Sequence, residues 1–373
     1  MTEPRAPGTF VASNPPGPEV SDGLSDRRAV LEIRGLSIAY LPSGGEVRAV
    51  EDVNLVVAAG EVVGLAGESG SGKSTLAYGA CRLLRPPAAI TSGSVVYRGR
   101  RVGPDGVEVL AQSARQLRKL RWREIAIVFQ SAMNCLNPVL KVRDQIVDAV
   151  DAHLAMSKGD MFERAANLID LVGIPRDRLR SYPHELSGGM RQRVMIAMAL
   201  AVDPEVIIMD EPTTALDVVV QREILQQIMA LKEQLGFSIL FITHDLSLVL
   251  ELADRVAIMY AGRLVEVGRA QDIAHRPLHP YTQGLLSSFP SLHGQRRQLA
   301  GIPGSPPDLR NLMPGCPFAP RCAHANSKCA TVSMDLVQFA KPGHTLHSSA
   351  CPFVPAPEEA KLTTAADEGI AGR

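Results

Sequence analysis

Residues 67–74 read Gly67-Glu68-Ser69-Gly70-Ser71-Gly72-Lys73-Ser74 and follow the pattern G-x-x-x-x-G-K-S of a phosphate-binding loop (P-loop). The apolar run 62–66 before them predicts a buried strand, and residues 74–81 after them suit the start of a helix. Glycines let backbone N–H groups point into one concavity, and a helix N-terminus favours negative charge there. Lys73 can reach the β- and γ-phosphates of a nucleotide, and the Ser74 hydroxyl suits Mg²⁺. The alternative is a glycine-rich turn without nucleotide, which the flanking strand and helix disfavour.

Charge and hydropathy narrow the classes of function. Of 373 residues, 46% are hydrophobic, enough for one large domain or two smaller ones. Lys plus Arg number 39 and Asp plus Glu number 39, so the formal net charge is zero, which argues against a broad polyanion-binding surface. Apolar runs such as Val194 to Val202 are too short to cross a bilayer, and the N-terminus lacks the apolar core of a signal peptide. We therefore expect a cytoplasmic protein whose role at any membrane is peripheral or through a partner.

Short apolar runs and helical patterns succeed one another along the chain. Strands are predicted at 30–40, 47–57, 62–66, 93–98, 124–129, 206–209 and 238–242. Apolar residues at helical spacing predict helices between about 142 and 202, and again over Val218 to Leu235. This order indicates an α/β core with a largely helical insertion. Residues 1–28, rich in Pro, Gly, Ser and charge, are expected to be disordered, and residues 354–373 to form a flexible tail.

Two carboxylates follow the apolar strand predicted at 206–209. Asp210 is suited to hold Mg²⁺, directly or through water, and Glu211 is suited to orient the attacking water. Phosphoryl transfer depends mostly on positioning and charge compensation, so these residue types fit the P-loop chemistry. The alternative is a strand that ends in solvated acids.

A second glycine pair opens another predicted helix within Leu186-Ser187-Gly188-Gly189-Met190-Arg191-Gln192-Arg193. Ser187 can cap this helix, and the two glycines leave backbone N–H groups accessible, which makes a second anion site. The alternative is a capped helix with a basic first turn.

With these motifs the sequence resembles the ATP-binding cassette (ABC) transporter ATPase subunits, whose signature motif matches residues 186–192. The resemblance covers about residues 30–353, and the family's motifs occur in the family's order. Gln130 matches the Q-loop, Asp217 in Ala215-Leu216-Asp217 the D-loop, and His244 the switch histidine. Tyr40 matches the aromatic residue that stacks on adenine.

The resemblance assigns a role to each of these residues. It implies ATP binding by Tyr40, Gly67, Glu68, Ser69, Gly70, Ser71, Gly72, Lys73, Ser74, Thr75 and Gln130. It implies Mg²⁺ binding through Ser74, Gln130 and Asp210, and catalysis by Glu211 and His244. It further implies that Ser187, Gly188, Gly189 and Gln192 face the ATP of a partner subunit, across a dimer to which Asp217 also contributes.

The fold and partners that the resemblance implies are those of an ABC cassette. This is an α/β P-loop NTPase with a RecA-like core, an antiparallel β subdomain and a helical subdomain (about 131–203), all within residues 29–289. Two such domains, identical or homologous, sandwich two ATP molecules and drive two transmembrane permease subunits that work with an extracytoplasmic solute-binding protein. The implied location is the cytoplasmic face of the membrane, with no nucleic-acid partner.

Four segments resemble the ATPase subunits of peptide/nickel-type importers for dipeptides and oligopeptides. They are residues 129–138, 181–193, 279–286 and 315–322. Residues 290–353 would then be the C-terminal extension of that branch, with its cysteine cluster. A rival function is a soluble ABC ATPase acting on nucleic acid or ribosomes, and a third is a cassette without turnover. The single P-loop and the lack of basic excess disfavour the soluble ABC ATPase. Glu211 and Lys73 disfavour the cassette without turnover.

The C-terminal cysteines Cys316, Cys322, Cys329 and Cys351 have the spacing C-x5-C-x6-C-x21-C. In the related importers this region is similar to a site that binds a 4Fe–4S cluster, so the resemblance predicts such a cluster as a structural staple. Structural zinc is the runner-up, and cysteines without metal are a third possibility. The family usually places its last cysteine soon after the Gly-His pair, here Gly343-His344, so His347 is an alternative to Cys351 as fourth ligand.

Overall fold

The computed structural model describes residues 27–42, 45–103, 105–130, 135–214, 216–288, 301–339 and 347–353. Its strands are β1 (Ala29–Tyr40), β2 (Val47–Ala58), β3 (Val62–Ala66), β4 (Ala88–Tyr97), β5 (Val107–Glu108), β6 (Ile125–Val128), β7 (Val206–Asp210), β8 (Ser238–Thr243), β9 (Arg255–Tyr260), β10 (Arg263–Arg269), β11 (Val337–Gln338) and β12 (Ser348–Ser349). Its α-helices are α1 (Lys73–Ala80), α2 (Ala114–Leu120), α3 (Val142–Asp151), α4 (Lys158–Leu171), α5 (Gly188–Ala199), α6 (Val218–Leu235), α7 (Leu246–Leu252), α8 (Ala270–His275) and α9 (Pro280–Ser287). Short 3₁₀ turns occupy Arg176–Arg180, Pro183–Glu185, Ala319–Arg321 and Ser327–Ala330.

The larger sheet is parallel at its centre. Strands β9, β3, β8, β7 and β6 lie side by side in this order and pair in parallel. Every residue of β3, β7 and β8 is buried. Such near-continuous apolar strands are expected where both faces of a parallel sheet are covered. The carboxyl ends of these strands therefore meet at one edge of the sheet, which is where ligands bind in open α/β folds.

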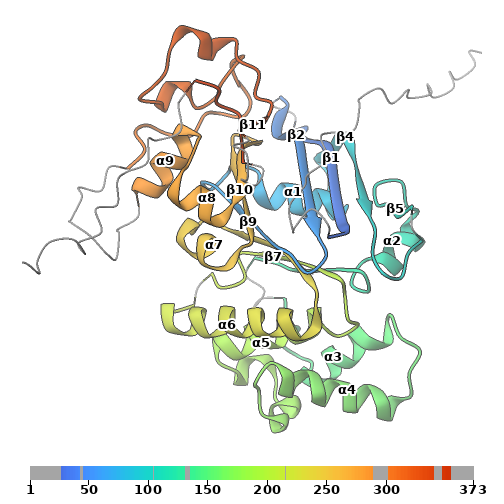
Figure 1. Cartoon of the computed structure of the whole chain (residues 1–373). Coiled ribbons are helices and arrows are strands. Elements are labelled where there is room, and N and C mark those ends of the chain that lie inside the picture. Colours follow the sequence, from blue (N-terminus) through green and yellow to red (C-terminus); the bar gives the residue numbers. More distant parts are fainter. Residues whose placement is uncertain are drawn as a thin grey trace, which may run out of the picture.

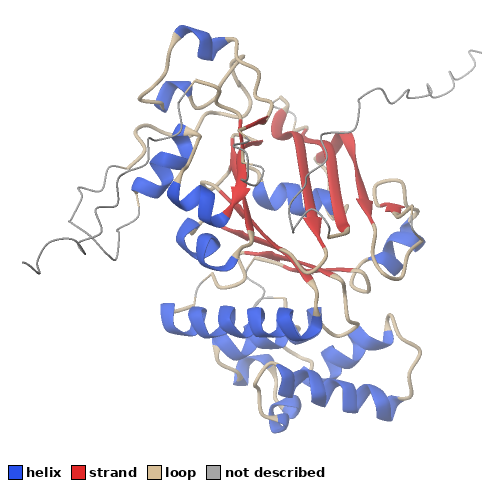
Figure 2. Ribbon diagram, viewed as in Figure 1, coloured by secondary structure: helices blue, strands red, loops and turns tan. Residues whose placement is uncertain are grey.

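A smaller antiparallel sheet has the strand order β2-β1-β4-β5. Figures 1 and 2 show it beside α1, apart from the larger sheet. Leu76 of α1 belongs to one buried cluster with Leu31 of β1, Val53 of β2 and Leu65 of β3. The helix that follows the P-loop is thus held by apolar packing against strands of both sheets.

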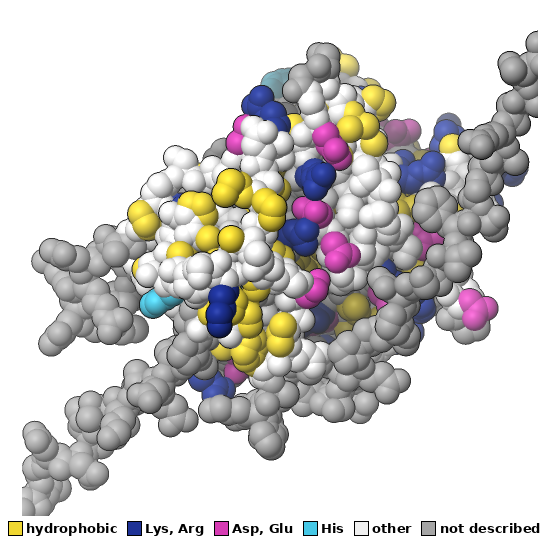
Figure 3. Space-filling model, turned by 90° about the horizontal axis from the view of Figure 1, so that it is seen from above, with side chains coloured by type: hydrophobic (Ala, Val, Ile, Leu, Met, Phe, Trp, Pro, Cys, Tyr) yellow, Lys and Arg dark blue, Asp and Glu magenta, His cyan; other side chains and the backbone are white. Residues whose placement is uncertain are grey.

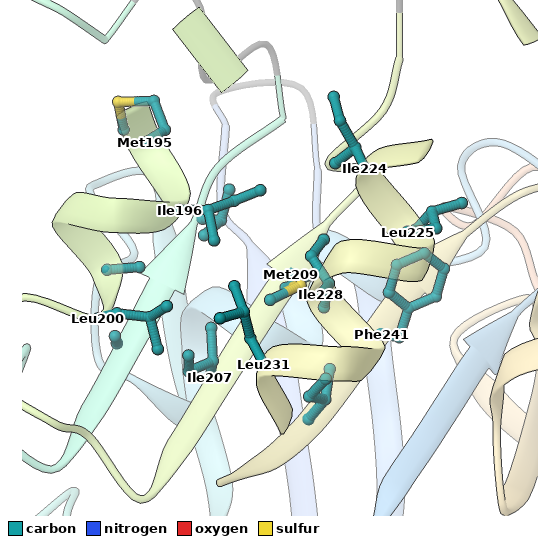
Figure 4. Packing of buried hydrophobic residues seen from close by; sticks show 14 of the residues in the cluster. Met195, Ile196, Leu200, Ile207, Met209, Ile224, Leu225, Ile228, Leu231 and Phe241 are labelled. Carbon is teal, nitrogen blue, oxygen red and sulfur yellow. The ribbon is translucent and has the colours of Figure 1, made fainter. Parts of the chain in front are cut away.

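A layer of helices lies below the parallel sheet in Figure 1 and contains α3, α4, α5 and α6. Figure 4 shows side chains of α5 and α6, among them Ile196 and Ile228, gathered over β7 and β8, where Met209 of β7 belongs to the same buried cluster. Capping side chains fix the starts of three of these helices. Ser157 and Ser187 accept N–H bonds at the first turns of α4 and α5, and Asp217 does so for α6.

The C-terminal segment returns to the edge of the larger sheet. β12 pairs with β10, and β11 pairs with β12. Glu266 of β10 is fully buried, and its carboxylate accepts the N–H groups of Leu278 (2.7 Å) and His279 (2.8 Å). It also lies 2.7 Å from Nε2 of His347. These bonds join the sheet edge, the start of α9 and the returning segment.

Most of the predicted elements are present in the structure. Strands occur at each predicted place, although β4 begins at Ala88, earlier than expected, and α6 has the predicted bounds. Strands β9 and β10 were not predicted. The expectations for residues 1–26 and 354–373, and parts of those for 131–134, 289–300 and 340–346, lie outside the described residues. In the described ranges no helix combines the length and apolar character needed to span a membrane.

The pair Glu61–Arg255 ties β3 to β9 and provides a test of the sheet. The side chain of Glu61 is 1% exposed and contacts Arg255 Nε at 2.9 Å. Replacing Arg255→Met leaves the buried Glu61 carboxylate without its cationic partner, so we expect the free energy of unfolding, measured by urea denaturation, to fall by roughly 3–5 kcal/mol. The control is Arg222→Met, whose pair with Glu251 is largely exposed (70% and 57%) and is expected to change it by under about 0.5 kcal/mol. Equal losses in both variants would contradict this interpretation.

Candidate functional site

The P-loop connects the buried strand β3 to the first turn of α1. Gly72, just before α1, has φ +106°, and a Cβ there would lie 2.3 Å from the carbonyl oxygen of Ala49. Only glycine fits this backbone and this close approach. The loop is also fixed from the side of β10, because Gly262 N–H donates to the Ser71 carbonyl oxygen at 3.0 Å. Ser69 and Gly70 are exposed at the tip of the loop.

Lys73 folds back over the loop that precedes it. Its Nζ donates to the carbonyl oxygens of Gly67 and Glu68, both at 2.8 Å, and lies 3.3 Å from Ser71 Oγ. Burial lowers the pKa of Lys73, and the charges of Glu211 and Asp210 partly offset this effect. The ammonium group therefore sits at the concavity where the phosphates of a nucleotide would lie.

Ser74, Tyr78 and Asp210 form one corner of the site. Ser74 Oγ donates to Asp210 Oδ1 at 3.0 Å, and the Tyr78 hydroxyl donates to Asp210 Oδ2 at 2.7 Å. Burial raises the pKa of Asp210, while the two hydrogen bonds lower it in part. The carboxylate is thus oriented through both of its oxygens, beside the hydroxyl predicted to bind Mg²⁺.

Glu211 lies at the centre of a group of polar side chains. Gln130 Nε2 donates to Glu211 Oε2 at 2.9 Å, and Thr214 Oγ1 donates to the same oxygen at 3.0 Å. His244 Nδ1 lies 3.1 Å from Glu211 Oε1. Burial raises the pKa of Glu211, but the bonds from His244 and Thr214 outweigh it, so the pKa lies below its ordinary value. The carboxylate is therefore ionised at neutral pH. Its backbone has φ +46°, a conformation that non-glycine residues adopt at a cost and often at functional sites.

The topology explains why these residues meet. Gln130 follows β6, Glu211 follows β7, His244 follows β8 and the P-loop follows β3. The four strands are neighbours in the parallel part of the sheet, so their carboxyl ends lie at the same edge. The structure thus brings together the Q-loop, acidic and switch residues predicted from the sequence.

Tyr40 borders the P-loop from the smaller sheet. It is the last residue of β1, and its hydroxyl lies 3.3 Å from Oγ1 of Thr75 in the first turn of α1. This position is next to the phosphate site, and the stacking of Tyr40 on adenine stays a prediction.

The signature residues lie elsewhere. Ser187 caps α5, which Figure 1 shows in the helical layer, well apart from α1. Ser187 is exposed, whereas the side chain of Gln192 is 3% exposed. A Cβ on Gly189 would lie 2.7 Å from Val220 Cγ1, so the start of α5 packs closely on the first turn of α6. The structure therefore does not join the signature to the P-loop of its own chain.

Asp217 caps α6 on the same side. Its Oδ1 accepts the N–H of Val220 at 3.0 Å, and the residue is exposed. Ala215 of the predicted D-loop lies outside the described residues.

Some residues of the site were missed by sequence reasoning. Tyr78 lies four residues after Ser74 on one face of α1, and this helical spacing could have indicated it. Thr214 carried no signal beyond its closeness to Glu211. The Glu68 side chain contacts Arg321 of the C-terminal segment at 2.8 Å, a pairing over a long sequence distance that no local pattern reveals.

The four C-terminal cysteines line one small cavity, whose other walls are mainly apolar and include Phe318, Val332, Pro352 and Phe353. Within the part of the chain that the structure describes, no group of three or more His, Cys, Asp or Glu side chains is placed to hold a metal ion. The prediction of a 4Fe–4S cluster is therefore wrong. The prediction of metal binding by Cys316, Cys322, Cys329 and Cys351 is wrong as well, including the zinc alternative.

The thiols lie in largely apolar surroundings. Burial raises the pKa of Cys316 to about 11 and also raises that of Cys322. Two sulfurs accept local N–H groups, Cys322 from His324 (3.4 Å) and Cys329 from Asn326 (3.5 Å). Neutral thiols in such a cavity act as small apolar side chains.

His347, the alternative fourth ligand, also has another partner. Its Nε2 lies 2.7 Å from the buried Glu266 Oε1. The pair Gly343-His344 lies outside the described residues.

Comparisons with known proteins agree with this arrangement. Residues 50–214 match the family model described as ABC transporter, and residues 265–329 match the one described as oligopeptide/dipeptide transporter, C-terminal region. The oligopeptide transport ATP-binding protein OppD of Salmonella typhimurium is 44% identical over 302 residues, which cover 80% of this chain and 88% of that protein. A putative peptide import ATP-binding protein of Brucella melitensis is 46% identical over 312 residues, 81% of this chain and 92% of that protein.

Solved structures show the same fold. A dimeric ATP-binding cassette in a post-hydrolysis state, bound to ADP and Pi, matches with a TM-score of 0.56 and 28% identity, covering 64% of this chain and 98% of that one. A component of an ABC transporter complex from Clostridium perfringens matches with a TM-score of 0.56 and 28% identity, covering 66% of this chain and 90% of that one. The predicted α/β cassette fold is thereby confirmed. The chain belongs to the ABC transporter family, as an ATP-binding ATPase subunit that carries the oligopeptide/dipeptide transporter C-terminal region.

Proposed function

We propose that this chain hydrolyses ATP to energise an importer of dipeptides, oligopeptides or related solutes. One observation carries the proposal above all: the P-loop, Asp210, Glu211 and His244 meet at one sheet edge, while the signature Ser187 lies at the start of α5 in the helical layer. This is half of a two-subunit ATP site. The peptide specificity rests on the relatives, which are named as oligopeptide transport and peptide import ATP-binding proteins.

The residues of the site fit ATP with Mg²⁺. The P-loop offers backbone N–H groups and the Lys73 ammonium, whose hydrogen bonds within the described residues go to carbonyl and hydroxyl oxygens. Ser74, Asp210 and Gln130 carry the side-chain oxygen atoms that Mg²⁺ prefers as ligands. When bound, Mg²⁺ would neutralise part of the charge that develops on the phosphates.

The residues around Glu211 then perform the hydrolysis step. The ionised Glu211 carboxylate orients the attacking water and withdraws its proton. His244 contacts the γ-phosphate, and Gln130 links the site to the helical layer that follows it in the chain. Thr214 holds one carboxylate oxygen of Glu211 in place at 3.0 Å.

The partners follow from the incomplete site. A second ATPase subunit, identical or homologous, supplies the signature residues that face this P-loop, and Ser187, Gly188, Gly189 and Asp217 of this chain serve the ATP of that partner. Two permease subunits and a solute-binding protein complete the transporter, and the chain works at the cytoplasmic face of the membrane.

On the face in Figure 3, Lys and Arg side chains alternate with Asp and Glu side chains, unlike the basic surface of a nucleic-acid-binding protein.

Replacing Glu211→Gln tests the catalytic assignment. The amide keeps the shape of the side chain but cannot accept the proton of water, so we expect ATP turnover to fall by about a hundredfold or more while ATP-bound dimers accumulate. The measurements are phosphate release and size-exclusion chromatography with ATP and Mg²⁺. The control is Glu233→Gln, an exposed acid of α6 (77% exposed). Undiminished turnover would remove Glu211 from its role.

Replacing Tyr78→Phe tests the orientation of Asp210. The variant loses one of the two hydrogen bonds to this carboxylate, so we expect the Mg²⁺ concentration for half-maximal hydrolysis to rise by roughly tenfold. At saturating Mg²⁺ the rate should return to that of the unmodified protein. A loss of rate that is the same at every Mg²⁺ concentration would contradict this role.

Co-purification tests the transport assignment. Extraction of cell membranes with detergent should recover this chain with two polytopic membrane subunits, identified by mass spectrometry. Recovery with ribosomes or nucleic acid, and without membrane subunits, would overturn the proposed function in favour of a soluble ABC ATPase.

A further inference from the structure

The second residue of the P-loop is bound to the C-terminal segment. Arg321 contacts Glu68 through two parallel bonds, Nη1 to Oε2 at 2.8 Å and Nη2 to Oε1 at 3.0 Å. Such a two-pronged pair fixes direction as well as distance, because the planar guanidinium matches the carboxylate. The Glu68 carboxylate is therefore directed at Arg321.

Arg321 is itself held rigidly. Its side chain is 6% exposed, and its Nε donates to the carbonyl oxygen of Pro303 at 2.8 Å. Nη1 also donates to the Tyr260 hydroxyl at 3.3 Å, and the guanidinium lies 5.8 Å from the Tyr260 ring centre and 6.0 Å from that of Phe318. A guanidinium buried to this degree needs a carboxylate partner, and Glu68 provides it. The hydrogen bond to Glu68 raises the pKa of Arg321, so the guanidinium stays charged.

The backbone of Glu68 is held from the same direction. Its N–H donates to the hydroxyl of Tyr281 at 2.8 Å, and Tyr281 is fully buried on α9. The Tyr281 ring packs on Tyr260 with ring centres 4.5 Å apart and on Phe318 at 5.4 Å. Tyr281 thus holds the backbone N–H of Glu68, and Arg321 holds its carboxylate. Both residues follow the parallel sheet in the chain.

The charge of Glu68 bears on how well the P-loop binds a nucleotide. Lys73, which faces the phosphate concavity, is bonded to the carbonyl oxygen of Glu68 at 2.8 Å. An unpaired carboxylate so close to the concavity would repel a triphosphate, since charges in partly buried sites are poorly screened. The Arg321 charge compensates that of Glu68, and the two bonds hold the carboxylate against the guanidinium.

We propose that Arg321 is a positioning residue for ATP: through Glu68 it sets the P-loop conformation, so that ATP affinity depends on the docked C-terminal segment. The inference rests on ATP binding at this P-loop, which is part of the proposed function. It adds a role for residues 301–339, which would then act on the nucleotide site without touching the nucleotide.

The test compares ATP affinity and turnover in full-length variants. Arg321→Met leaves Glu68 unpaired, so we expect the Kd for ATP with Mg²⁺, measured by titration calorimetry, and the KM for hydrolysis to rise by roughly tenfold. The kcat at saturating ATP should stay within about twofold, because the residues around Glu211 are untouched. Arg321→Lys keeps the charge but not the two-pronged geometry, and its effect should be intermediate.

The decisive comparison repeats Arg321→Met in a Glu68→Gln background. Without the carboxylate there is no charge left to repel the phosphates, so the loss of affinity should shrink several-fold. A general disruption of the C-terminal segment would lower affinity equally in both backgrounds and would overturn the inference. Arg310→Met is the matched control, because the Arg310 pair with Asp308 in the same segment is exposed (63% and 53%), and affinity should not change.

The two levels of proposal fail in different ways. If the unmodified chain binds no ATP, the proposed function fails and this inference with it. If the unmodified chain binds ATP and Arg321→Met binds it equally well, only the inference is overturned.

Discussion

The parallel pairing of β3 with β8, and of β8 with β7, is the constraint on which the rest of the structure depends. It aligns the carboxyl ends of buried strands, so the P-loop, Glu211 and His244 arrive at one edge although they are far apart in the chain. Glu211 directly follows β7 at this edge of the sheet, and its backbone has the unfavourable φ of +46°. The buried strands hold this backbone, because the hydrophobic free energy of a large sheet exceeds the cost of one unfavourable residue.

Much of this could be predicted from the sequence, for a physical reason. The P-loop, the acidic pair and the strands that carry them depend on local patterns: apolar runs, glycines at turns and caps at helix starts. The strands β9 and β10 were missed, although Val256 to Tyr260 form an apolar run like those of the predicted strands. The Glu68–Arg321 pair was missed because it joins residues whose sequence separation is 253. Contacts of that kind depend on the tertiary fold, and a single sequence does not encode them in any local window.

The cysteine cluster shows where spacing misleads. The sequence groups Cys316, Cys322, Cys329 and Cys351 in one segment, and in the structure all four line one cavity. The sequence says nothing of what else surrounds them. Burial raises the pKa of Cys316 and Cys322, and the buried Glu266 contacts His347. Proximity is a matter of chain geometry, whereas ligation also requires charge, direction and room, and those are set by neighbours distant in sequence.

The close contact between Gly189 and Val220 has a consequence for association with a partner. A Cβ on Gly189 would lie 2.7 Å from Val220 Cγ1 and would force one of the two to shift, so the starts of α5 and α6 pack closely as one block. Ser187 and Asp217, both exposed, project from this block at fixed relative positions. Any subunit that docks there meets a surface whose parts were already aligned during folding. The entropy of ordering them is therefore not lost again at each encounter, which favours rapid cycles of association and release.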